Sequence, residues 1–156
     1  MTAELFTAVQ RPRLRKLVRR LIDIYSPSGK EEEILAYLSG YLKRNGLPVT
    51  RQEVDDSRYN LLVIPPDMDI RMVFVGHLDT VSAYDLDSYE YEEENDEIFG
   101  LGAADMKGGC AAMIEAYLGA HERFRGRLPV ALALVVGEEE EGDGAQELVR
   151  DYHFPW

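Results

Sequence analysis

Two short apolar segments constrain the fold more than any other feature of this sequence. Residues 129–136 (PVALALVV) contain no polar side chain, and residues 71–76 (RMVFVG) are apolar after the first position. Runs of this length are typical of strands that are buried on both faces of a sheet. Such a strand needs helices above and below it, so the sequence predicts a layered α/β fold with a sheet flanked by helices.

Helical segments are predicted between these strands. Helices are expected over residues 11–25, over a segment after Glu31 that stops at Asn45, from residue 105 to about 123, and from about residue 144; further strands are expected at 48–54 and 60–64. Ser28 lies three residues before Glu31, the spacing of a capping box, which predicts how the second helix begins. No repeat or linker divides the chain, so residues 1–156 are predicted to form one unit.

The charge of the chain excludes several kinds of partner. The sequence holds 29 acidic and 17 basic residues, and its net charge of −12 argues against nucleic acid and anionic membrane surfaces. No apolar run approaches the roughly 18 residues that a membrane-spanning helix needs, and the N-terminal residues lack the pattern of a secretory signal. The lone Cys110 cannot form an internal disulfide, which fits a reducing compartment. We therefore expect a cytoplasmic protein with no nucleic-acid or membrane partner.

The charges are unevenly distributed along the chain. Residues 11–20 (RPRLRKLVRR) are strongly basic, and apolar residues recur there at helical spacing, at Leu14, Val18, Leu21, Ile22 and Ile24. This pattern predicts either a solvated helix face or a surface that binds an acidic partner. Residues 85–97 (DLDSYEYEEENDE) hold eight acids and no base, and they are predicted to form a surface loop or hairpin, because they lack an EF-hand pattern.

A histidine and an aspartate follow the strand predicted at 71–76. His77 and Asp79 are two residues apart, so in extended chain their side chains point to the same face. A carboxylate beside an imidazole is the usual means of orienting a metal-binding histidine, because the second ring nitrogen donates to it. The alternative is that His77 and Asp79 only satisfy each other's hydrogen-bonding groups at the end of the strand and bind no metal.

A glycine-rich segment precedes the third predicted helix. Residues 100–109 (GLGAADMKGG) contain four glycines, which predicts a sharp bend or a close approach of the backbone. Asp105 is predicted to open the helix, where it could serve simply as its N-cap. The segment lacks the spacing of a phosphate-binding loop. Cys110 is predicted to pack in the core.

An acidic segment, residues 137–142 (GEEEEG), directly follows the most apolar strand. Four glutamates are most simply a solvated loop. However, open α/β sheets place their ligand sites at the carboxyl ends of strands, where His77, Asp79 and these glutamates all lie. Clustered carboxylates repel one another, and a divalent cation removes that repulsion. An imidazole with several carboxylates suits zinc, cobalt or manganese.

Three segments together resemble one known family. GHLDTV (76–81), GLGAADMKGGCAAM (100–113) and VVGEEEEGDGA (135–145) look like successive signatures of the di-zinc peptidase/deacylase family, and SPSGKEE (26–32) is similar to its N-terminal helix entry. Its members include acetylornithine deacetylase, succinyl-diaminopimelate desuccinylase, aminoacylase and carboxypeptidase G. The resemblance implies a zinc-exopeptidase-like catalytic domain, of which residues 1–156 form a truncated N-terminal portion.

The resemblance implies roles for five residues. His77, Asp105 and Glu139 would bind metal, two Zn²⁺ per complete site with Co²⁺ or Mn²⁺ as substitutes, and the peptide bond after Asp105 is often cis in the family. Asp79 and Glu138 would be catalytic: Asp79 would orient the ring of His77, and Glu138 would act as the general base. The run of four glutamates also leaves the pair Glu139 and Glu140 open.

The sequence also departs from the family. Family members are more than twice as long, and they add a further acidic ligand, a C-terminal histidine ligand and a lid or dimerisation domain. The resemblance therefore implies a metal-dependent hydrolase of amide bonds, acting on small N-acyl amino acids or short peptides. Its full-length form could be a homodimer, and this chain alone would be weakly active or inactive. Two alternatives stay open: a non-catalytic metal-binding half-domain completed by a partner chain, and an acidic structural module without metal.

Overall fold

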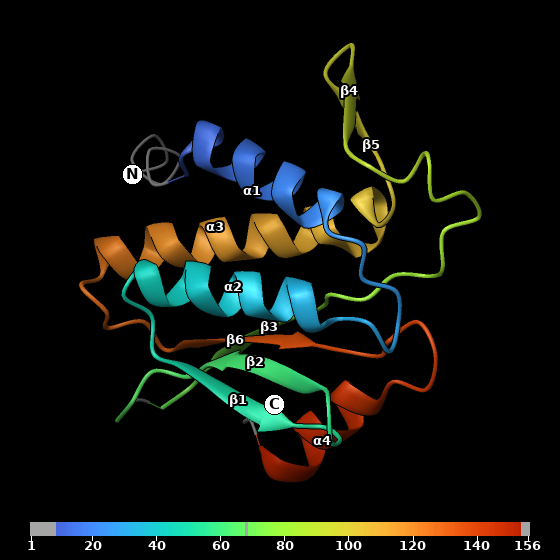
Figure 1. Cartoon of the computed structure of the whole chain (residues 1–156). Coiled ribbons are helices and arrows are strands. Elements are labelled where there is room, and N and C mark those ends of the chain that lie inside the picture. Colours follow the sequence, from blue (N-terminus) through green and yellow to red (C-terminus); the bar gives the residue numbers. More distant parts are fainter. Residues whose placement is uncertain (1–8, 68, 154–156) are drawn as a thin grey trace.

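The computed structural model describes residues 9–67 and 69–153, and it has the predicted α/β architecture (Figure 1). Four strands form one mixed sheet in the order β1 (Val49–Glu53), β2 (Tyr59–Val63), β6 (Val130–Val135) and β3 (Met72–His77). β1 and β2 are antiparallel, as are β2 and β6, whereas β6 runs parallel to β3. The two apolar segments therefore lie side by side, and the layered sheet flanked by helices is confirmed.

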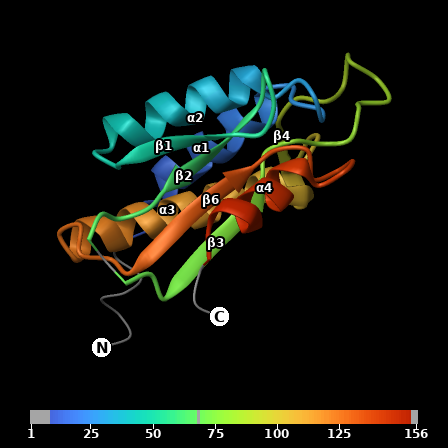
Figure 2. The ribbon, with the colours of Figure 1, turned by 90° about the horizontal axis from the view of Figure 1, so that it is seen from below.

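The helices cover the two faces of the sheet unequally. α1 (Arg11–Asp23), α2 (Glu32–Arg44) and α3 (Gly108–Arg123) lie on one face, and α4 (Asp143–Asp151) lies on the other (Figures 1 and 2). β6 alternates its side chains between the two layers: Leu132 and Leu134 join the core under the three helices, while Ala133 and Val135 pack with Leu148 of α4. This two-sided burial is why residues 129–136 are apolar at every position.

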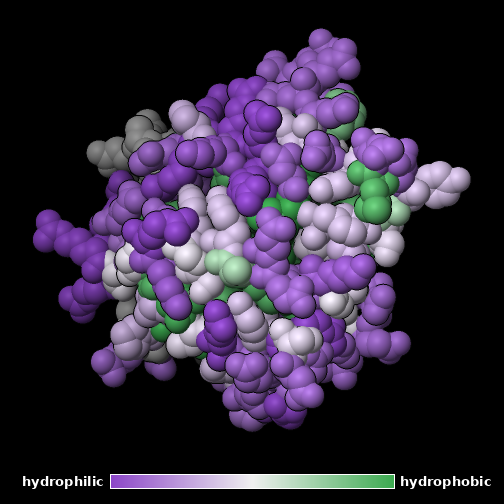
Figure 3. Space-filling view, viewed as in Figure 1, coloured by the Kyte–Doolittle hydropathy of each residue, from purple (hydrophilic) through white to green (hydrophobic). Residues whose placement is uncertain are grey.

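The basic helix presents a solvated face. The apolar stripe of α1 is buried, and the face that carries α1 and α2 is mostly hydrophilic (Figure 3). Arg15 pairs with Glu93, and Arg19 pairs with Asp23. Arg13 is different, because its Nε donates to the buried carboxylate of Glu115 at 2.7 Å and so joins α1 to α3.

The acidic segment 85–97 ends in the predicted hairpin. β4 (Glu92–Glu94) pairs with β5 (Glu97–Phe99) in antiparallel register. Asn95 and Asp96 connect them with φ of 52° and 66°, the backbone that a tight two-residue hairpin turn requires.

The predicted capping box is wrong. α2 begins at Glu32, and neither Ser28 nor Glu31 caps it through a side chain. The backbone at Pro27 instead pairs with Thr80 as an isolated parallel bridge, which carries Ser28 toward Asp79. The local spacing is compatible with a cap, but the side chain of Ser28 instead donates a hydrogen bond to Asp79, which follows the distant strand β3.

Among the described residues, no helix combines the length and the apolar character needed to cross a membrane. The pattern expected of a secretory signal concerns the N-terminus, whose residues 1–8 lie outside the described residues.

Candidate metal centre

The predicted ligands meet at the carboxyl ends of β3 and β6. His77 is the last residue of β3 and lies opposite Val135, so the segment that follows β6 starts beside it. One ligand atom from each of His77, Asp105 and Glu139 lies within 4.8 Å of the others. Three residues from separate parts of the sequence therefore form one cluster.

His77 directs its two ring nitrogens to different surroundings. Nε2 faces the exposed acids, 3.1 Å from Oδ1 of Asp105 and 3.6 Å from Oε2 of Glu138. Nδ1 faces Asp79, 3.0 Å from its backbone oxygen and 3.6 Å from Oδ1 of its carboxylate. A proton on Nδ1 would be donated to Asp79 and would leave the Nε2 lone pair for a cation.

Asp79 is fully buried and connects three segments. Its Oδ2 accepts hydrogen bonds from Oγ of Ser28 at 2.7 Å and from the backbone N–H of Glu139 at 3.0 Å. Burial alone would raise the pKa of Asp79, but the interactions with His77, Ser28 and the Glu139 backbone lower it to about 2. Asp79 is therefore an anion that orients His77 and also fastens the acidic loop, residues 137–143, to the end of β3. Ser28 is a site residue that sequence reasoning missed, because SPSG resembled a cap.

Asp105 does not open a helix, contrary to the prediction. It lies in η1 (Ala103–Lys107), an irregular turn in which Asp105 and Met106 have extended or bridging backbone angles, and α3 begins only at Gly108. The Asp105–Met106 peptide bond is cis, as the resemblance implied. The turn begins at Gly102, where φ is 76° and an added Cβ would lie 2.7 Å from Cγ2 of Thr80. The glycine-rich segment therefore makes a close bend that projects Asp105 toward His77.

A buried lysine anchors this turn, and sequence reasoning missed it. The side chain of Lys107 is fully buried, and its Nζ donates to the backbone oxygen of Ile24 at 2.6 Å. Ile24 is the C-cap of α1, where the helix dipole favours a cation. Burial lowers the pKa of Lys107 to about 8. Cys110 packs in the core as predicted, and its Sγ donates to the backbone oxygen of His77.

The acidic loop presents its first two glutamates to His77. Glu138 lies within 3.6 Å of the ring, and Glu139 belongs to the ligand cluster. Burial, followed by the charge of Asp105, raises the pKa of Glu139. Glu140 and Glu141 are exposed and do not belong to the cluster among the described residues. Of the four glutamates, Glu138 and Glu139 are therefore the two that lie beside His77.

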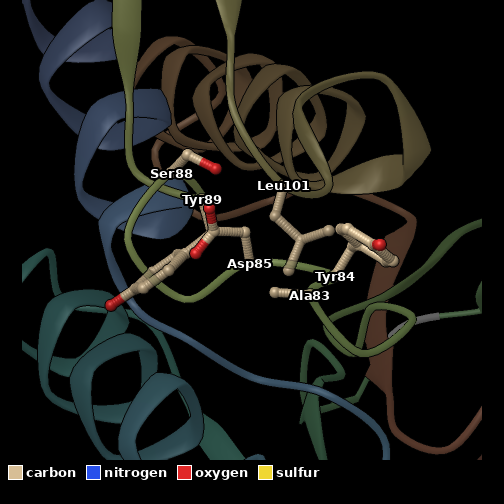
Figure 4. A pocket seen from close by; sticks show the side chains of 6 residues that line it. All are labelled: Ala83, Tyr84, Asp85, Ser88, Tyr89 and Leu101. Carbon is tan, nitrogen blue, oxygen red and sulfur yellow. The ribbon is translucent and has the colours of Figure 1, made fainter.

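One hollow reaches the ligand cluster, and a second hollow shares one lining residue with it. The first has a volume of about 380 Å³ and reaches the carboxylates; it is lined by Thr80, Val81, Gly100, Leu101, Gly102, Ala103, Ala104, Asp105 and Glu139. The second, of about 220 Å³, is lined by Ala83, Tyr84, Asp85, Ser88, Tyr89 and Leu101 (Figure 4). Leu101 lines both hollows. The first hollow, which is the one beside the ligands, is bordered mostly by small or apolar residues.

The pKa of His77 gives the first testable prediction. The Asp79 carboxylate, then that of Asp105, raises this pKa from 6.5 to about 9 against the opposing effect of burial. Because the folded pKa exceeds the unfolded one, protonated His77 stabilises the metal-free chain fully below pH 6.5, and the effect is lost as pH rises through 9. We expect the difference in unfolding free energy between the wild type and His77→Gln to shrink by at most about 3 kcal/mol over this range.

Urea denaturation in a metal chelator at pH 6, 7.5 and 9.5 measures this difference. Lys107 also titrates in this pH range, but it contributes equally to the unfolding free energies of both proteins. Its contribution therefore cancels when one free energy is subtracted from the other. A difference that stays constant or grows with pH would contradict the assigned surroundings of His77.

Comparison with known proteins identifies the family of this chain. The family model described as "Peptidase family M20/M25/M40" matches residues 73–155. A probable carboxypeptidase of Neosartorya fischeri is 30% identical over 155 residues, covering 87% of this chain and 35% of the relative. A probable succinyl-diaminopimelate desuccinylase of Staphylococcus epidermidis is 30% identical over 139 residues, covering 85% of this chain and 34% of the relative.

Solved structures share the fold. A tripeptidase from Staphylococcus aureus matches with a TM-score of 0.74 and 26% identity, covering 92% of this chain and 41% of the tripeptidase. Human carnosine dipeptidase 1 matches with a TM-score of 0.69 and 22% identity, covering 90% and 35% of the two chains, and this likeness concerns the fold alone. The chain thus spans about a third of the length of the curated relatives it matches. The resemblance seen in the motifs is confirmed: the chain belongs to the peptidase family M20/M25/M40.

Proposed function

We propose that residues 1–156 are the N-terminal, metal-binding portion of a catalytic domain that hydrolyses an amide bond. The observation that carries this proposal is the convergence of His77, Asp105 and Glu139 at the carboxyl ends of two parallel strands. Relatives named carboxypeptidase, desuccinylase and tripeptidase support a short peptide or a small N-acyl amino acid as substrate. The hollow beside the ligands offers room for a small side chain or acyl group.

The donor set fits a divalent cation. One imidazole and two carboxylates present nitrogen and oxygen ligands, and the mutual repulsion of the acids favours a bound charge of opposite sign. His77, Asp105 and Glu139 would hold Zn²⁺, with Co²⁺ or Mn²⁺ as substitutes and two ions in a complete site. Bound zinc would supply Lewis-acid polarisation of the substrate carbonyl and would acidify water.

The residues around the cation have separate tasks in this proposal. Asp79 holds Nδ1 of His77 and keeps Nε2 directed into the cluster. Glu138 is exposed and lies 3.6 Å from Nε2 of His77, so its carboxylate can take a proton from water and pass it to the departing amine. This assignment makes Glu138 the general base and Glu139 a ligand.

The chain covers about a third of its curated relatives, so we propose that further ligands and substrate-binding groups come from outside it. One observation favours the alternative of a half-domain completed by a partner chain. β3 pairs only with β6 among the described strands, and its Met72 and Val75 are 54% and 46% exposed. An edge strand with exposed apolar side chains is suited to association, including a homodimer of a longer form. A cytoplasmic location, which the buried free Cys110 fits, belongs to the same proposal.

Calorimetric titration of the metal-free chain with Zn²⁺, combined with assays on N-acetyl amino acids and dipeptides, tests the proposal. We expect saturable binding and at most slow hydrolysis, far below the typical enzymatic rate of about 10 per second. Glu138→Gln is expected to abolish residual hydrolysis and to keep Zn²⁺ affinity close to that of the wild type. Absence of saturable binding would refute the metal site, and activity that appears only after mixing with a second chain would favour the half-domain.

A further inference from the structure

A buried asparagine lies beneath the acidic loop. Asn60 is on β2, whose next three residues, Leu61, Leu62 and Val63, are all apolar and buried. A polar amide in this position is destabilising unless its hydrogen-bonding groups are satisfied. The Asn60 side chain satisfies them with three hydrogen bonds, and two of these reach across the sheet to distant backbone.

Those two hydrogen bonds close the acidic loop at its neck. Oδ1 of Asn60 accepts from the backbone N–H of Val136 at 3.2 Å, and Nδ2 donates to the backbone oxygen of Gly144 at 2.8 Å. Val136 immediately precedes the loop and Gly144 immediately follows it. The N–H of Gly144 also donates to the oxygen of Val136 at 3.1 Å, so one side chain and one backbone bond hold both ends of the loop together.

The hydrogen-bonding groups at the end of β6 explain why position 60 on β2 holds an asparagine. The pairing of β2 with β6 stops at Leu61 and Leu134, so the N–H of Val136 lies beyond the strand ladder. A buried N–H without a partner is costly, and an apolar residue at position 60 could not supply one. The third hydrogen bond, from Nδ2 to Oε1 of Gln52 on β1, holds the amide in the orientation that serves both ends of the loop.

We infer that Asn60 is a positioning residue that holds the acidic loop in the conformation that directs Glu138 and Glu139 toward His77. This inference rests on the proposed function for its consequence, the binding of metal. The hydrogen bonds of Asn60 go to Gln52, Val136 and Gly144 and not to the ligand cluster, so Asn60 acts through the loop backbone. The acidic loop is thus held at two places. The backbone N–H of Glu139 donates to Asp79 near the ligands, and Asn60 holds the two ends of the loop at its neck.

Amide hydrogen exchange and Zn²⁺ titration of the whole chain test this role in Asn60→Ala. We expect exchange at the amides of Glu139, Gly142 and Gly144 to accelerate by about tenfold or more relative to amides of α3. We expect the Kd for Zn²⁺ to rise by about 10-fold or more, the usual effect of losing a group that supports metal ligands. Leu148→Ala is the matched control, because it loosens the packing of α4 but leaves the hydrogen bonds of the loop intact.

The control separates positioning from general stability. If Leu148→Ala destabilises the chain to a similar degree but leaves the three loop amides and the Kd unchanged, Asn60 acts on the loop. Equal effects of both variants, or unchanged loop exchange in Asn60→Ala, would overturn the inference. If the wild type binds no Zn²⁺, the proposed function fails, while the exchange data still decide whether Asn60 holds the loop.

A second variant covers the case in which Asn60→Ala does not fold. Asn60→Asp keeps an acceptor for the N–H of Val136 but cannot donate to the oxygen of Gly144. We expect faster exchange at Gly142 and Gly144 together with weaker Zn²⁺ binding. Wild-type exchange and affinity in this variant would also overturn the inference.

Discussion

Glu139→Gln is expected to lower the affinity of the chain for Zn²⁺ by more than about 100-fold, whereas Glu140→Gln leaves it near the wild-type value. Loss of a direct ligand should exceed the 10–100-fold effects of changes outside the coordination sphere. Glu139 has an oxygen within 4.8 Å of ligand atoms of His77 and Asp105, while Glu140 is exposed and outside that cluster. An amide oxygen is a weaker ligand than a carboxylate, so the substitution removes coordination and charge together.

The two variants form a matched pair. Each removes one negative charge from the same loop, so general attraction of the cation by the acidic surface changes equally in both. Calorimetric titration at two salt concentrations measures the affinities. Equal losses in the two variants would assign the binding to bulk electrostatics, and a larger loss in Glu140→Gln would move the functional pair to Glu139 and Glu140.

Gly144→Ala is expected to destabilise the chain by about 3 kcal/mol, the upper end of the usual cost of overpacking. A Cβ at this position would lie 2.5 Å from Oδ1 of Asn60, 2.5 Å from the backbone oxygen of Val136 and 2.7 Å from its nitrogen. Two of these three atoms belong to the backbone, so no side-chain rotation relieves the overlap. α4 must move away from the end of β6, and the neck of the acidic loop opens with it.

Gly40→Ala provides the comparison, because Gly40 lies inside α2 and its added Cβ would meet only the flexible Arg44 side chain, 3.0 Å from Nη1. We expect this change to be neutral or to stabilise the chain by up to about 1 kcal/mol, since alanine favours a helix interior. Urea denaturation of both variants gives the free energies of unfolding. A Gly144→Ala variant as stable as Gly40→Ala would show that the neck of the loop is not tightly packed.

The parts of the fold that follow from local pattern were predictable. Residues 129–136 indicated a central strand, because only burial on both faces leaves no polar position. The meeting of His77 with the glutamates after β6 was predictable for a related reason. Neighbouring parallel strands end at the same edge of the sheet, so residues just past their ends converge.

The parts that depend on distant contacts were not predictable from local pattern. Ser28 has the spacing of a cap, but its hydrogen-bond partner, Asp79, lies 51 positions away. Asp105 precedes a helix, yet the packing of Lys107 against the end of α1 draws the chain into an irregular turn before the helix begins. Asn60 is a single polar residue within an apolar strand, and no periodicity marks such a position.

The place of β6 in the sheet sets the order in which the molecule can assemble during synthesis. Among the described strands, β6 comes last in the sequence, yet it lies between β2 and β3, which do not pair with each other. On the ribosome, β1 and β2 can pair as soon as they emerge, but β3 has no partner among the described strands until residues 130–135 leave the exit tunnel. Until then α1, α2 and α3 lack part of the sheet that they cover, and the edges of β2 and β3 that later pair with β6 are exposed. Insertion of β6 then joins β1, β2 and β3 into one sheet, and the same step brings Glu139 beside His77.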